Sequence, residues 1–203
     1  DEPVVDFRSL CGNLTSGVGD FAIWENMVRP VSPMTTVRIW NTNLQSMLYC
    51  EVPVEGGRPQ ERGDYNIPGV PGNGAKIQVD FAETAGQGVG ALLPTGNPMD
   101  RLEVAGLGTI DASMIDIGNP HVFIRAKDIG LKGTETADQI DADKDLTELL
   151  ERIRSHAAFT MGMISNPARG KQESPAAPII AMISPPQDYD APLSDRTVKA
   201  EES

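Results

Sequence analysis

Glycine and proline divide this chain into short segments, and their spacing constrains the fold more than any other feature of the sequence. The 203 residues include 20 Gly and 16 Pro, which separate runs of alternating polar and apolar side chains. Residues 36–40 and 76–80 show this alternation. A period of two is typical of a strand with one buried and one solvated face, as in antiparallel sheets. We predict a mainly antiparallel sheet with strands at residues 4–8, 35–40, 45–53, 75–81, 109–115, 121–126 and 179–184.

Two stretches have helical spacing instead. Residues 14–28 are apolar on most sides, which predicts a helix enclosed by sheet. Residues 143–163 carry Leu and Ile on one face and acidic side chains on the other, with Asp143 as a candidate N-cap. Residues 166–178 are rich in Gly, Pro, Ser and Lys and are expected to form a mobile loop. The predicted fold class is α+β.

We expect two lobes. A strand ends near Asp80, and the stretch that follows, residues 83–96, is rich in glycine. Residues 1–80 are therefore predicted to belong to an N-terminal lobe and residues 81–203 to a second lobe.

The formal net charge of −12 excludes some partners. Nucleic acid and anionic membranes attract basic surfaces, and no apolar run approaches the roughly 18 residues of a membrane span. A small anionic substrate remains compatible with this charge, because backbone N–H groups can hold a carboxylate locally. We expect a small-molecule carboxylate as the partner. A homodimer is also compatible with the sequence.

The chain contains two cysteines, Cys11 and Cys50, too few for a disulfide framework and without zinc-binding spacing. This usage is typical of the reducing cytoplasm. His121 and His156 have no evident third ligand, so we expect no metal. The glycine-rich segments lack the motifs that bind nucleotide phosphates, so we expect no cofactor.

The most reactive candidate is Cys11, which precedes Gly12 and Asn13 at the start of the apolar helix. Free N–H groups at a helix N-terminus favour a thiolate or a bound carboxylate. Gly12 allows a substrate close to the backbone, and Asn13 adds a polar side chain. On local grounds alone, a cysteine in such a sequence is more often a small buried apolar residue.

A second candidate is the Gly-Asn-Pro-His turn at residues 118–121, before a predicted strand. Its Asn119 is able to hydrogen-bond a substrate. An ordinary turn before a strand is the simpler interpretation.

The order of the motifs resembles the PrpF family of methylaconitate, methylitaconate and aconitate isomerases and oxalomesaconate tautomerases. The resemblance rests on Cys-Gly-Asn-Leu-Thr-Ser at 11–16, Val-Arg-Ile-Trp-Asn-Thr-Asn at 37–43, the segments 69–75 and 92–97, and Ser-Pro-Ala-Ala-Pro at 174–178. It implies a fold like that of diaminopimelate epimerases, in which two similar lobes each wrap an antiparallel sheet around a hydrophobic helix.

The resemblance also implies a chemistry, a cofactor-independent 1,3-proton shift that moves a double bond in an unsaturated di- or tricarboxylic acid. Cys11 is then one acid/base. Gly12, Asn13 and either Thr15 or Ser16 hold a substrate carboxylate, and Asn119 faces them from the other lobe.

Family members are about twice this length, and their second acid/base is a lysine upstream of the cysteine turn. The resemblance therefore implies that this chain alone is incomplete as an enzyme. The chain also begins with Asp-Glu-Pro and without Met, so we expect that the first residue is not the natural start. Two alternatives stay open: an amino-acid epimerase or racemase on the same fold, which needs a second cysteine in a matching turn, and a catalytically inactive accessory or binding protein.

Overall fold

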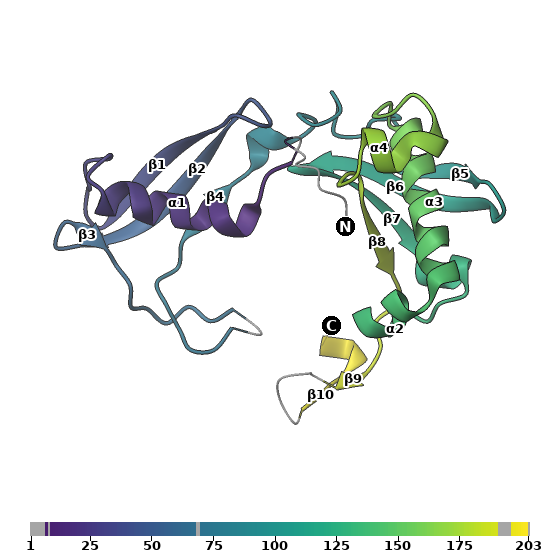
Figure 1. Ribbon diagram of the computed structural model, residues 1–203. Helices are drawn as coiled ribbons and strands as arrows, with labels where there is room; N and C mark the ends of the chain where they lie inside the picture. The colour runs from purple at the N-terminus through teal and green to yellow at the C-terminus, as the bar shows by residue number, and fades with distance from the viewer. Residues whose placement is uncertain (1–6, 8, 68–69, 191–195, 203) are drawn as a thin grey trace.

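Two four-stranded sheets, each with a long helix packed against it, form the two halves of the molecule (Figure 1). The computed structural model describes residues 7, 9–67, 70–190 and 196–202. The α+β class is confirmed, and the pairing within both sheets is antiparallel except at one strand pair.

The first half is built around one central strand, which pairs antiparallel with its three neighbours. In its register, Val37 lies opposite Cys50, so that both side chains point toward the helix. The elements of this half are α1 (Gly12–Trp24), β1 (Met34–Asn41), the central β2 (Ser46–Glu55), β3 (Arg58–Pro59) and β4 (Gln78–Asp80). The short helix η1 (Ala82–Thr84) follows β4.

The helix α1 buries one face against this sheet. Ala22 and Ile23 pack with Cys50 and Val52, while Gly19 allows the helix backbone to approach β2 closely. The opposite stripe of α1 is exposed in the described structure: Leu14 76%, Val18 41%, Phe21 56% and Trp24 41%. The sheet thus contacts one side of an apolar helix.

The second half has the strand order β5-β6-β7-β8, and its core lies between the sheet and α3. Its β7 and β8 are parallel, because the chain between them crosses over through helices that include α3. The elements are β5 (Asp100–Val104), β6 (Gly108–Ile117), β7 (Asn119–Arg125), η2 (Ala126–Ile129), α2 (Ala137–Ala142), α3 (Lys144–Thr160), η3 (Pro167–Arg169), α4 (Gly170–Glu173) and β8 (Ile179–Ile183). A small antiparallel pair, β9 (Tyr189–Asp190) and β10 (Thr197–Val198), and the helix η4 (Ala200–Glu202) follow.

Most predicted strands are confirmed, although β4 is shorter than residues 75–81. The sequence did not predict β5 or the two-residue strands β3, β9 and β10. The strand predicted at residues 4–8 falls largely outside the described residues. Both predicted helices are confirmed, and the Asp143 side chain accepts a hydrogen bond from the Leu146 N–H, as an N-cap does.

Both helices end before the predicted residues, α1 at Trp24 and α3 at Thr160, and the same motif stops each of them. Asn26 and Gly162 adopt left-handed φ angles of 57° and 75°, each directly after the C-cap residue of α1 or α3. In each case the next residue donates back into the last turn, from the Met27 N–H to the Ala22 carbonyl and from the Met163 N–H to the Ala158 carbonyl. This is the Schellman motif, which stops a helix.

The expectation of a mobile loop at residues 166–178 is wrong. The segment forms η3 and α4, and Ser174 and Ala177 within it are almost completely buried. Arg154 of α3 donates hydrogen bonds to the carbonyls of both residues, and Asn166 caps η3 within the segment.

Candidate functional site

Cys11 occupies the N-cap position of α1, with an exposed side chain. Its carbonyl accepts the first helical hydrogen bond, from the Thr15 N–H at 3.1 Å, and its side chain makes no capping bond. The thiol is thus available to solvent at the beginning of a helix. The chain reaches this point from the junction between the two halves (Figure 1).

The first turn of α1 offers open backbone donors beside this thiol. Within the described structure, the N–H groups of Gly12, Asn13 and Leu14 have no hydrogen-bond acceptor. Gly12 and Asn13 are themselves exposed. Free N–H groups and the positive end of the helix dipole favour negative charge at this place. The arrangement is able to hold a carboxylate next to Cys11.

The other two predicted residues of this turn use their hydroxyl protons within the helix. The Thr15 hydroxyl donates to the Cys11 carbonyl at 2.8 Å and is buried toward the sheet. The Ser16 hydroxyl donates to the Asn13 carbonyl at 2.7 Å. Their role in substrate binding stays a prediction.

Asn119 comes from the second half and lies next to the cysteine turn. Its Oδ1 accepts from the Leu10 N–H at 3.0 Å, and its Nδ2 donates to the Leu10 carbonyl at 3.1 Å. The side chain therefore pairs with the backbone of the residue directly before Cys11. The prediction that Asn119 faces this turn agrees with the geometry, whereas a contact with substrate stays a prediction.

Cys50 contrasts with Cys11. It is completely buried on the face of β2 that packs against α1, and its Sγ donates a long hydrogen bond to the Ser16 carbonyl at 3.9 Å. Burial raises the pKa of the Cys50 thiol, and the neighbouring Asp20 carboxylate raises it further. Cys50 is therefore a packing residue whose thiol stays protonated.

Asp116 is a buried carboxyl group that the sequence analysis missed. It lies at 0% exposure near the end of β6, and its Oδ2 accepts from the N–H groups of Gly88 and Val89 at 2.7 and 2.9 Å. Burial raises the pKa of Asp116 above its ordinary value of 3.8, although the two N–H groups and His121 oppose this shift. Through these two bonds the carboxyl group connects the segment between the two halves, at Gly88 and Val89, to β6, the strand before Asn119.

A second missed residue is Arg154, which is 7% exposed. Its guanidinium forms an ion pair with Glu151 at 2.7 Å in addition to its bonds to the 174–178 segment. Burial alone raises the pKa of Glu151, but hydrogen bonds and charge from Arg154 outweigh burial and lower this pKa below its ordinary value. Neither Asp116 nor Arg154 stands in a motif, so only knowledge of their burial identifies them.

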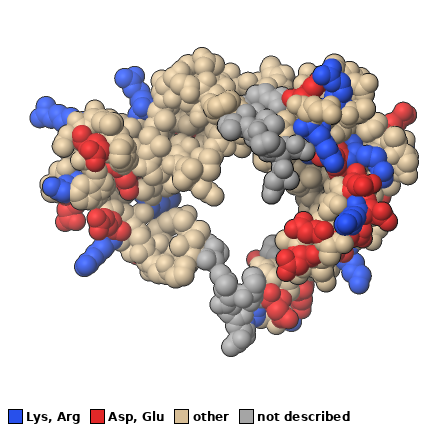
Figure 2. Space-filling view, viewed as in Figure 1, with Lys and Arg blue, Asp and Glu red and all other residues tan. Residues whose placement is uncertain are grey.

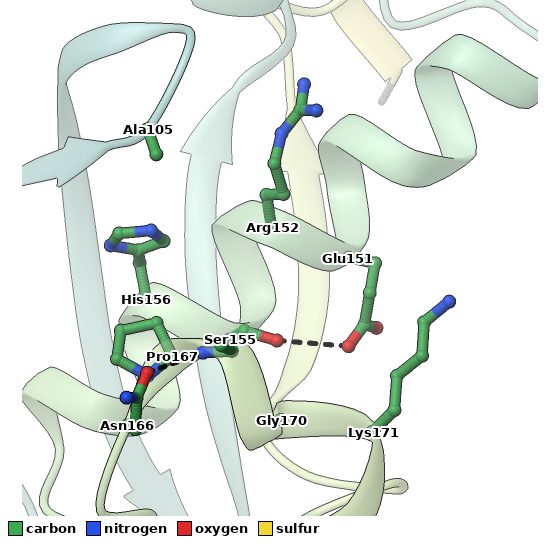
Figure 3. A pocket seen from close by; sticks show the side chains of 10 residues that line it. Ala105, Glu151, Arg152, Ser155, His156, Asn166, Pro167, Gly170 and Lys171 are labelled. Carbon is green, nitrogen blue, oxygen red and sulfur yellow. Dashed lines mark hydrogen bonds between the residues drawn. The ribbon is translucent and has the colours of Figure 1, made fainter.

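A separate pocket of about 500 Å³ lies beside α3 and α4, and none of the predicted site residues lines it. Figure 3 shows Arg152, His156 and Lys171 around it, together with Glu151, which is hydrogen-bonded to Ser155. Because Glu151 is already engaged by Arg154 and Ser155, this pocket has no free carboxylate among the described groups that line it.

The space-filling view shows a wide opening between the two halves (Figure 2). Charged side chains gather over the half that contains α3, whereas residues other than Lys, Arg, Asp and Glu (tan) dominate the other half near the opening. Among the described residues, no helix has both the length and the apolar character needed to cross a bilayer.

Comparison with known proteins identifies relatives over nearly the whole chain. The family model described as PrpF protein matches residues 1–202. The chain is 45% identical over 188 residues to a 3-methylitaconate isomerase from Eubacterium barkeri, covering 93% of this chain and 49% of the relative. It is 40% identical over 212 residues to a 2-methyl-aconitate isomerase from Shewanella oneidensis, covering 100% of this chain and 52% of the relative.

The fold agrees with these sequence matches. The crystal structure of a methylitaconate-delta-isomerase superimposes with a TM-score of 0.84 at 43% identity, over 98% of this chain and 51% of that one. The chain thus spans about half the length of the relatives it matches. With the family model, the sequence identity and the shared fold in agreement, the chain belongs to the PrpF family.

Proposed function

We propose that the protein containing this chain is a cofactor-independent isomerase that moves a carbon–carbon double bond in an unsaturated di- or tricarboxylic acid. Cys11, at the start of α1, is proposed as one of the two acid/base residues, and Gly12 and Asn13 are the proposed carboxylate-binding residues. The observation that carries this proposal is the exposed Cys11 thiol beside the open N–H groups of α1.

The proposed reaction is an allylic 1,3-proton shift. The Cys11 thiolate takes a proton from the carbon next to the double bond and becomes a thiol. The electron pair left on carbon spreads through the alkene into a carboxylate as a dienolate. A second group returns a proton to the far carbon, so that the double bond has moved and no atom is gained or lost. Donors aimed at the dienolate charge lower the barrier.

The second proton carrier is proposed from the family resemblance alone, as a lysine upstream of the cysteine turn. The substrate class is proposed from the names of the relatives, which are a 3-methylitaconate isomerase and a 2-methyl-aconitate isomerase. Methylitaconate, methylaconitate, aconitate and oxalomesaconate are therefore the acids to test. Each offers a carboxylate next to an alkene.

The experiment is an absorbance assay of the complete natural protein with each of these acids. Turnover changes the alkene absorbance, and we expect it with at least one of them. Iodoacetamide should inactivate the protein by labelling Cys11, and the acid that turns over should slow this labelling. An exposed Cys11 that is labelled equally fast with and without every acid contradicts the proposed site.

Two other functions make different predictions. An amino-acid epimerase or racemase on this fold would exchange the α-proton of an amino acid and would need a second exposed cysteine; Cys50 is buried. A binding or accessory protein would hold a tricarboxylate without changing its absorbance. Three measurements separate these functions. Proton NMR in D₂O detects exchange of an amino-acid α-proton, the absorbance assay detects turnover of an unsaturated acid, and calorimetry detects binding of a tricarboxylate without turnover.

The division into lobes at residues 1–80 and 81–203 is also part of the proposal. So are a homodimeric assembly and a location in the cytoplasm. The two free thiols, Cys11 and Cys50, are in keeping with a reducing compartment.

A further inference from the structure

The backbone of residues 9 and 10, directly before Cys11, is held by side chains from both halves of the molecule. From the second half, the Asn119 amide forms its reciprocal pair with the Leu10 N–H and carbonyl. From the first half, Asn43 donates from Nδ2 to the Ser9 carbonyl at 2.9 Å. These bonds come from two side chains, Asn119 at the first residue of β7 and Asn43 in the turn between β1 and β2, and they set the path of this segment.

Asn119 is itself rigidly placed. It follows Gly118, whose φ of 76° makes the tight turn between β6 and β7, and it pairs with Ile117 across that turn. Its carbonyl lies 2.6 Å from the His121 Nδ1. Below the turn, Asp116 accepts the two N–H groups of the segment that connects the halves. The backbone that carries the Asn119 side-chain amide is therefore held by the turn and by its pairing with β6.

Asn43 is also held by a defined turn, the one between β1 and β2. In this turn the Asn41 side chain accepts from the Leu44 N–H at 2.9 Å, and Gln45 adopts a left-handed φ of 52°. Asn43 lies on the surface, whereas Asn119 is partly buried. Bonds to a partly buried amide are less exposed to competition from water, so the Asn119 pair is the stronger of the two restraints.

We propose that Asn119, assisted by Asn43, is a positioning residue that fixes the Cys11 turn through the backbone of Leu10. This inference rests on the proposed function of Cys11. Both ends of the Asn119 amide are engaged by Leu10, so its role is to orient the thiol and the first N–H groups of α1. Reactions of oriented groups are sensitive to displacements of about 1 Å, which can cost about 100-fold in rate.

The test compares Asn119→Ala with Asn166→Ala in the complete natural protein. Asn166 loses a similar bond in its variant, because its Oδ1 accepts from the Ala168 N–H at 2.9 Å. It caps η3 and makes no hydrogen bond to residues 9–13 in the described structure. Hydrogen–deuterium exchange of the backbone amides of residues 9–13 measures how firmly Asn119 holds Leu10, and it does not depend on turnover. We expect Asn119→Ala to speed exchange of the Leu10 amide about 10-fold and to lower kcat about 10- to 100-fold, with KM within about threefold. Asn166→Ala should leave exchange at residues 9–13 and kcat unchanged.

A second variant keeps the test informative if Asn119→Ala does not fold. Asn119→Asp keeps an acceptor for the Leu10 N–H but cannot donate to the Leu10 carbonyl. We expect slow exchange of the Leu10 amide in this variant and a smaller loss of kcat than in Asn119→Ala.

Three results would overturn the proposal: unchanged exchange at Leu10 in Asn119→Ala, Asn119→Asp exchanging as fast as Asn119→Ala, or a raised KM with unchanged kcat, which marks a substrate contact. If Cys11 proves dispensable for turnover, the proposed function fails. The exchange result still reports whether Asn119 holds Leu10, so the two failures are distinguishable.

Discussion

At the scale of single residues, Asp116 and Arg154 stabilise the segments that the fold places around its candidate site. Both are buried ionisable side chains. Asp116 accepts hydrogen bonds from two backbone N–H groups at residues 88–89, and Arg154 donates to two backbone carbonyls at residues 174–177. Removing such a group leaves buried polar partners without a bond, which costs more than the bond itself contributes.

Asp116→Ala should lower the free energy of unfolding by about 2–4 kcal/mol, because the N–H groups of Gly88 and Val89 lose their acceptor. Asp116→Asn keeps an acceptor oxygen and should cost less. Urea unfolding of both variants measures this difference. Equal losses would mean that the hydrogen bonds contribute little.

The same carboxyl group should make stability depend on pH. Its folded pKa is raised from 3.8 by burial, so the neutral form is favoured in the folded state. Its contribution is complete below pH 3.8 and is lost as the pH rises through the folded pKa. The unfolding free energy of the natural protein, relative to Asp116→Asn, should therefore fall as the pH rises above 3.8. A difference that increases over this range would contradict the assignment.

Arg154→Ala should cost about 3–5 kcal/mol, because Glu151 loses its ion-pair partner and the Ser174 and Ala177 carbonyls each lose the hydrogen bond from the guanidinium. Arg154→Lys, with a smaller set of donors, should recover part of this loss. The matched control is Arg169→Ala, which breaks an ion pair with Glu173 at a 59% exposed side chain and should cost less than about 1 kcal/mol. Similar melting temperatures for Arg154→Ala and Arg169→Ala would refute the argument.

At the scale of elements, α1 depends on close contact with β2. A Cβ atom added at Gly19 would lie 2.6 Å from the Cys50 Sγ and 2.7 Å from the Val52 Cγ2, whereas one added at Gly17 meets no atom within 4 Å. Gly17→Ala should therefore stabilise the helix, by up to about 1 kcal/mol. Gly19→Ala should destabilise the protein by about 1–3 kcal/mol. Thermal unfolding of the two variants is the measurement, and equal stability would exclude close packing at Gly19.

Local sequence signals predicted these elements well, and their ends less well. Alternation identified β1, β2, β6 and β7, since a half-buried strand needs it. The stop of α1 at Trp24 depends on the left-handed Asn26, and apolar periodicity continues past it. The buried part of the 166–178 segment is bonded to Arg154, which lies 20 residues before Ser174 and 23 before Ala177 in the chain. Such contacts leave no local pattern in the sequence.

At the scale of the whole molecule, the two halves meet where Asn119 pairs with Leu10. The sequence identified the turns at residues 11–13 and 118–121 as candidate site segments. Cysteine at a helix start can carry a proton, and asparagine in a tight turn can hydrogen-bond a substrate. The sequence could not predict that the amide of Asn119 binds backbone, since that pairing joins residues 109 positions apart. Family resemblance related the two turns to one reaction, and the fold brings them together.

The central claim is that Cys11 carries a proton in a double-bond isomerisation. Proton NMR in D₂O, with methylitaconate and the complete natural protein, follows both the migration of the double bond and the deuterium that enters the product. The matched pair is Cys11→Ala and Cys50→Ala, one at the exposed thiol and one at the buried thiol. We predict that Cys11→Ala lowers the rate about 10²- to 10⁴-fold while Cys50→Ala keeps turnover within about tenfold of the natural protein. Deuterium incorporation by Cys11→Ala at the natural rate would contradict the account.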